Sequence, residues 1–177
     1  MKSKDKQAYF ILIRYIIGIL IAALFIYSDY LYSIFFNFTI IPLNFILSLF
    51  YETNLTINTI QIQDNIIQII PACVAISAYL LLFLLNITTK ISIKKRILAL
   101  VFSFSLLLFF NIVRLVILSI LFLTNNSYFD IVHKFFWYFL STLLVVLIWF
   151  LTTLTLKIKN IPIYTDFKTL INLIKYS

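Results

Sequence analysis

The sequence predicts an all-α integral membrane protein with about four transmembrane helices, an interfacial helix and a small β-hairpin. Of its 177 residues, 63% are hydrophobic, and the mean hydropathy is +1.09. These values lie far outside the range of soluble globular domains. One glycine and three prolines leave no glycine-rich phosphate loop and no flexible linker. We therefore expect one membrane-embedded domain over residues 1–177.

The charges of the chain indicate its topology rather than a polar ligand. The net charge is +8, but the lysines and arginines flank apolar segments, where such residues orient a protein in the membrane. We therefore expect no nucleic-acid partner. The single cysteine cannot form an internal disulfide, and one cysteine with one histidine is too few for a zinc site. No metal or cofactor is expected.

The first apolar run, residues 9–27, is long enough to cross a hydrocarbon core of about 30 Å. A cleavable signal peptide is the weaker interpretation, because no small-residue cleavage site follows the run. Residues 29–70 are expected on the outer face, with an interfacial helix from about Pro42 to Tyr51. A crossing in this segment would place the basic cluster at 94–96 opposite the N-terminal lysines, against the positive-inside rule.

The end of this outer segment has the pattern of a β-hairpin. Residues 55–63 alternate in part and are rich in β-branched side chains, Asp64 begins a turn signal, and residues 66–70 are strand-like again. The hairpin leads into Pro71, which is suited to the first turn of a helix because its missing N–H would have no intrahelical partner there.

Three further spans are predicted over about 72–90, 97–123 and 133–156. Residues 162–177 show helical spacing of apolar residues beside lysines, which predicts an amphipathic helix on the cytoplasmic surface. With these spans, both termini and the basic cluster lie in the cytoplasm. We expect a multi-pass protein of the cell membrane in an archaeon or a bacterium.

Cys73 and Arg114 are the first two candidate site residues. Cys73 falls in the first turn of a helix, where the dipole favours negative charge and a thiol becomes a better nucleophile. The alternative is a small buried hydrophobic residue. Arg114 lies inside an apolar span, where a charge is costly, and Asn111 shares its helix face. Its alternative role is a snorkelling arginine or a structural hydrogen-bond donor.

His133 is the only histidine, and Asp130 lies three residues before it. A histidine near a carboxylate can act as a general acid or base close to neutral pH. The alternative is an interfacial histidine that hydrogen-bonds water.

Helix rise predicts a similar membrane depth for these candidates. From Lys90 back to Cys73 is 17 residues, or roughly 26 Å, and from Arg96 to Arg114 is 18 residues, or roughly 27 Å. His133 also falls near the outer boundary of the hydrocarbon core. A thiolate, an imidazole and a guanidinium at one depth suit acyl transfer, as nucleophile, proton carrier and binder of an oxyanion or carboxylate.

The same residues resemble the exosortase/archaeosortase family of membrane cysteine transpeptidases. The similarity rests on Pro71-Ala-Cys73 opening a helix, Asn111-Ile-Val-Arg114 in the next helix and His133 at the start of the last one. It covers roughly residues 40 to 150, as in a compact archaeosortase-like member. The family often has a small residue and a glycine after the cysteine, whereas this chain has Val74 and Ala75.

This resemblance implies Cys73 as nucleophile, Arg114 as the essential arginine and His133 as the third catalytic position, with Asn111 orienting Arg114. It also implies substrates that are secreted proteins with a C-terminal motif, a transmembrane helix and a basic tail. The new C-terminus would pass to a membrane lipid or another surface acceptor. The outer hairpin and residues 30–52 are expected to bind the substrate motif.

Two other functions fit the same sequence. The chain could be a membrane assembly factor or a small transporter subunit without enzymatic activity, in which Cys73 is structural. It could also be an intramembrane protease that uses water as the acceptor. The residues themselves do not separate hydrolysis from transpeptidation.

Overall fold

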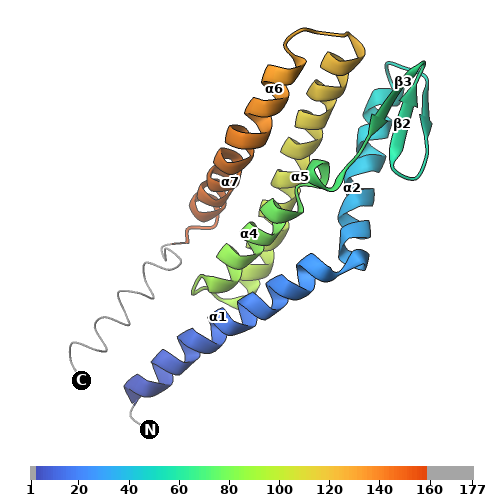
Figure 1. Ribbon diagram of the computed structural model, residues 1–177. Coiled ribbons are helices and arrows are strands. Elements are labelled where there is room, and N and C mark those ends of the chain that lie inside the picture. Colours follow the sequence, from blue (N-terminus) through green and yellow to red (C-terminus); the bar gives the residue numbers. More distant parts are fainter. Residues whose placement is uncertain (1–2, 159–177) are drawn as a thin grey trace.

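The computed structural model describes residues 3–158, which form a mostly helical chain with one small antiparallel sheet (Figure 1). In chain order the elements are α1 (Ser3–Tyr27), α2 (Asp29–Ser48), β1 (Thr53–Leu55), β2 (Thr59–Ile62), β3 (Asn65–Gln68), α3 (Pro71–Val74), α4 (Ile76–Thr88), α5 (Ile93–Leu123), α6 (Phe129–Phe135), the π-helical turn η1 (Phe136–Leu140) and α7 (Ser141–Thr155). The predicted tail helix at 162–177 lies outside the described residues.

Helix α5 is the longest element and contacts α2, α4, α6 and α7. The start of α1, the α4–α5 connection and the end of α7 lie toward one end of the molecule (Figure 1). The sheet and the α5–α6 turn lie toward the other end, which we call the sheet end. The long helices therefore run between two distinct ends.

The structure differs from the prediction between residues 29 and 51. Instead of an interfacial helix from about Pro42 to Tyr51, α2 runs unbroken from Asp29 to Ser48 and includes Pro42. Ser28 separates α2 from α1 because its backbone is extended and its Oγ accepts a hydrogen bond from the Leu31 amide at 3.3 Å. Pro42 removes one helical hydrogen bond, but buried residues on both sides of it keep the helix packed.

The sheet is a three-stranded meander rather than the predicted two-stranded hairpin. Residues 55–63 do not form one strand, because the chain turns at residues 57–58 and the Thr56 amide donates to the Thr59 carbonyl at 2.9 Å. Strand β2 is central, and its Ile60 and Ile62 are buried on one face while Gln61 is exposed on the other. The predicted alternation therefore holds within β2 and sets the face that packs on the protein.

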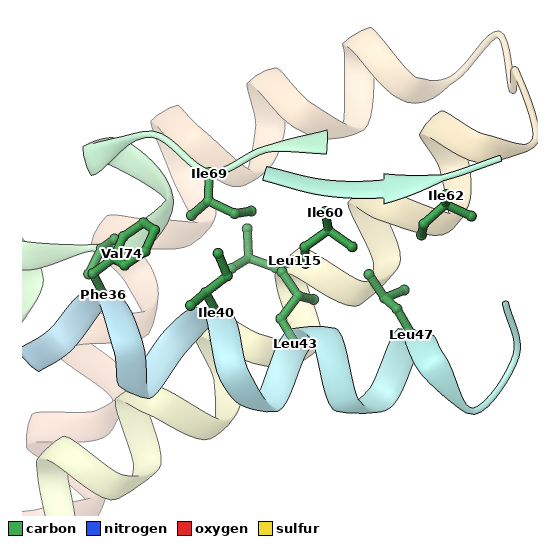
Figure 2. Close-up of a cluster of buried hydrophobic side chains, with 9 residues drawn as sticks. All are labelled: Phe36, Ile40, Leu43, Leu47, Ile60, Ile62, Ile69, Val74 and Leu115. Atoms are coloured by element: carbon green, nitrogen blue, oxygen red, sulfur yellow. The ribbon is translucent and has the colours of Figure 1, made fainter. Parts of the chain in front are cut away.

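The main hydrophobic cluster joins α2, the sheet, the Cys73 turn and α5 (Figure 2). Its buried members are Phe36, Ile40, Leu43, Leu47, Ile60, Ile62, Ile69, Val74 and Leu115. A second cluster between α4, α5 and α7 contains Tyr79, Leu82, Leu107, Val145 and Ile148. The first cluster, which we call the sheet-end core, positions the segment that contains Cys73.

Three helices are long and apolar enough to cross a membrane: α2, α5 and the continuous helix Phe129–Thr155. The predicted count of about four spans is therefore too high among the described residues, and the set differs. The predicted span 72–90 is broken, and its apolar helix covers Ile76–Thr88, while α1 contains the shorter apolar stretch Leu12–Ile21. The remaining predicted spans begin earlier than expected, at Ile93 and Phe129.

Candidate active site

Cys73 lies in α3, a single helical turn over Pro71–Val74 that, together with Ala75, we call the Cys73 turn. Pro71 occupies its start, as predicted, and the Cys73 amide donates to the Ile70 carbonyl at 2.8 Å. Ala75 then adopts the left-handed conformation, with φ 58° and ψ 36°. An L-residue rarely adopts this conformation, and it interrupts the helix. Cys73 is half-buried and lies between these two points.

The interruption leaves backbone carbonyls that a continuous helix would have paired. The carbonyls of Ala72 and Cys73 would otherwise accept from the amides four residues ahead. In the structure, side chains of α5 take that place. Asn111 Nδ2 donates to the Cys73 carbonyl at 2.9 Å, and Arg114 Nη2 lies 3.4 Å from the same oxygen and 3.5 Å from the Ala72 carbonyl. The predicted pairing of Asn111 and Arg114 on one helix face therefore serves the cysteine turn directly.

Arg114 also makes a hydrogen bond to the start of α7. Its Nη1 donates to Ser141 Oγ at 3.2 Å, and that hydroxyl donates to the Phe136 carbonyl at 2.7 Å. Ser141 directly follows the π-helical turn η1, a type of distortion that is frequent at functional sites. Ser141 was not predicted as a site residue, because its only signal in the sequence is a polar residue within a long apolar helix.

The described residues do not use all five N–H donors of the Arg114 guanidinium. Its Nε is buried and has no hydrogen-bond partner among the described residues. Arg114 also lines a cavity of about 100 Å³, which is bordered mainly by apolar side chains of α4, α5, η1 and α7. Asn111, Arg114 and Ser141 are its polar lining residues. A buried, incompletely paired arginine is costly in an apolar helix, and such residues usually mark a functional site.

The Cys73 side chain packs against the sheet-end core, and of the Cys73 turn only Ala75 lines the cavity. Tyr32 of α2 packs on the same core. The thiol is therefore bordered by α2 and the sheet. Tyr32 is a second residue that the sequence analysis did not single out.

His133 and Asp130 do not join this group. Both are exposed on α6, and the His133 ring stacks between Phe129 and Trp137, with ring centroids 5.6 and 6.1 Å away. Within residues 3–158, His133 makes no hydrogen bond or ion pair to Cys73, Arg114 or Asp130. The structure thus brings together Cys73, Asn111 and Arg114 and leaves the histidine apart.

Among the described residues, no three His, Cys, Asp or Glu side chains cluster as metal ligands would. In comparisons with protein-family models, curated proteins and solved structures, nothing matches this chain.

Proposed function

We propose that this protein is a membrane cysteine transpeptidase of the exosortase/archaeosortase type. It would cleave secreted proteins near a C-terminal hydrophobic helix and transfer the new C-terminus to a lipid or another surface acceptor. The observation that carries the proposal is the convergence of Asn111 and Arg114 on the Cys73 turn. Two polar side chains of an apolar helix bind the main-chain carbonyl of the residue that carries the only thiol of the chain.

In the proposed reaction, the Cys73 thiolate attacks the carbonyl carbon of the scissile peptide bond and forms a C–S bond. The negative charge moves to the carbonyl oxygen, where Arg114 can stabilise it. The position of Arg114 supports this role because its Nη2 lies 3.4 Å from the main-chain carbonyl of Cys73, the residue that carries the thiol. Collapse of the intermediate breaks the C–N bond and leaves a thioester on Cys73.

The leaving nitrogen takes a proton as it departs, and His133 is the proposed donor. The acceptor nucleophile then attacks the thioester, gives up its proton and releases the Cys73 thiolate. His133 lies on the exposed face of α6, so this role requires it to reach the leaving group in the substrate complex. Asp130 is then the neighbouring carboxylate on the same helix.

The proposal includes a membrane orientation. The sheet end would face outward, while the start of α1 and the basic α4–α5 connection would face the cytoplasm. A substrate helix would then enter the membrane beside the site, with its basic tail on the cytoplasmic side.

A structural role for the same residues is the second candidate, and one observation favours it. Asn111 and Arg114 complete the hydrogen bonds of an interrupted helix, which a non-enzymatic assembly factor would also need. In that case Cys73 would contribute packing alone.

The deciding experiment replaces Cys73 by Ser and by Ala and follows C-terminal processing of a candidate secreted protein from the same organism. We expect both changes to reduce processing on the order of 1,000-fold or more, because the nucleophile is lost. Arg114→Ala should cost about 100-fold to 1,000-fold, as for a lost oxyanion donor. His133→Ala should also abolish processing.

Matched controls are Ser77→Ala, an exposed position in α4, and Lys134→Ala, beside His133. Both should process the substrate normally. The amount of each variant in the membrane is measured in parallel. Normal processing by a fully accumulated Cys73→Ala protein would refute the enzymatic proposal and leave the structural role.

A further inference from the structure

The free edge of strand β3 presents unpaired backbone groups beside the cysteine turn. The Ile69 amide donates to the Asn58 carbonyl at 2.9 Å, which fixes the alternation of the β2–β3 ladder. In an antiparallel pair, hydrogen-bonded and non-hydrogen-bonded pairs alternate. Ile60 and Ile67 are therefore a hydrogen-bonded pair, whereas Ile66 and Gln68 are not bonded to their partners on β2.

The N–H and C=O groups of Ile66 and Gln68 consequently point away from β2. No hydrogen bond of the described residues involves these four groups, and the side chain of Ile66 is 60% exposed. Proteins usually protect such an edge with charged residues, proline or a covering element. Strand β3 has the sequence Asn-Ile-Ile-Gln, without charge or proline. The edge is therefore a ready template for another strand.

The direction of β3 connects this edge to the candidate nucleophile. Ile69, directly after the strand, is buried in the sheet-end core, and Ile70 is the extended residue that opens α3. Cys73 follows Gln68 by five residues and packs against the same core as Ile67. A chain that continued along the edge of β3 would therefore run toward the turn that contains Cys73.

We propose that an extended segment of the secreted substrate, just before its cleavage site, pairs with β3 as a fourth strand. This inference rests on the proposed function. A substrate whose hydrophobic helix enters the membrane after the cleavage site runs in the same direction as β3, so the added strand is parallel. At about 3.3 Å per residue, the paired segment lies roughly three to seven residues before the scissile bond.

Strand addition also indicates the kind of motif that is recognised. Main-chain hydrogen bonds provide affinity in this binding mode, and alternate side chains provide specificity. Side chains of the substrate on the face of Ile67 would meet the apolar surface of the protein, and those on the face of Ile66 would meet solvent. The substrate segment should therefore tolerate exchange at every second position.

The first test places a benzophenone amino acid at position 66 or 68 of full-length Cys73→Ala protein in its native cells. Leu55 is the matched control. It lies on β1 at the opposite edge of the sheet, and its backbone N–H and C=O groups likewise point away from the central strand. Illumination should couple positions 66 and 68, at least fivefold more than position 55, to one defined peptide. By mass spectrometry, that peptide lies just before the C-terminal hydrophobic segment of a secreted protein. Capture of a second copy of this chain, or equal capture at position 55, would overturn the proposal.

The second test removes one outward donor with Gln68→Pro and uses Leu55→Pro as its control. We expect Gln68→Pro to raise the substrate concentration needed for half-maximal processing at least tenfold, while Leu55→Pro and the membrane levels of both proteins stay unchanged. If Cys73-dependent processing is present but Gln68→Pro leaves it unaltered, strand pairing is wrong and the transpeptidase proposal stands. If processing does not depend on Cys73 at all, the proposed function itself fails.

Discussion

Replacement of Ala75 by Gly tests whether the helix is interrupted after Cys73. An interrupted and a continuous helix predict changes of opposite sign in the free energy of unfolding. Ala75 has φ 58°, and the left-handed conformation costs an alanine roughly 1–2 kcal/mol. Glycine avoids that cost but loses about 0.5–1 kcal/mol more chain entropy on folding. The balance predicts that Ala75→Gly raises the free energy of unfolding by about 0.5–1 kcal/mol.

An uninterrupted helix would give the opposite result. Glycine in a helix interior is about 1 kcal/mol less favourable than alanine. Ala78, three residues later in α4, provides this comparison, and Ala78→Gly should destabilise the protein by at least that amount. The two alanines are close in sequence, so the same membrane environment applies to both.

The assay is equilibrium unfolding in mixed micelles, in which sodium dodecyl sulfate is titrated and helix content is followed by circular dichroism. Both variants and the unaltered protein are compared at one lipid and detergent composition. A loss of stability in Ala75→Gly comparable to that of Ala78→Gly would refute the left-handed turn. The explanation of why Asn111 and Arg114 reach the Cys73 and Ala72 carbonyls would then fail with it.

Two further predictions concern the contacts around Arg114. Asn111→Leu removes the donor to the Cys73 carbonyl, so the free energy of unfolding should fall by about 1–3 kcal/mol, whereas Asn111→Gln should recover part of that loss in the same unfolding assay. Ser141→Ala removes one of the partners of the guanidinium, and we expect processing to slow by about 10-fold with little change in membrane level, while Thr142→Ala, at an exposed neighbouring position, leaves the rate unaltered.

The sequence predicted those features that have a local chemical cause. Proline at the start of a helix, the two apolar spans of α5 and Phe129–Thr155, and the shared face of Asn111 and Arg114 all follow from residue type and helix spacing. The left-handed Ala75 has no such signature, because alanine is the best helix former and glycine would be the usual signal. The contact of Ser141 depends on a π-helical turn, which has no local pattern in the chain.

The prediction for residues 29–51 failed for a different reason. The distribution of lysines informs the side of the membrane on which a loop lies, but it carries no information about whether a segment is helical. Pro42 was given the weight of a helix start, although an apolar helix packed on both sides can contain it. The separation of His133 from Cys73 likewise depends on tertiary geometry that equal depth along three helices does not define.

The contacts that hold the Cys73 turn have a consequence for how related sites could be recognised. Asn111 and Arg114 bind main-chain carbonyls, so their contacts place no demand on the side chains at Ala72 and Cys73. Residues around a cysteine that is held in this way can diverge without loss of the hydrogen bonds that position it. Distant relatives would then share the Asn-x-x-Arg spacing and a bend in the preceding helix, even where the neighbours of the cysteine differ.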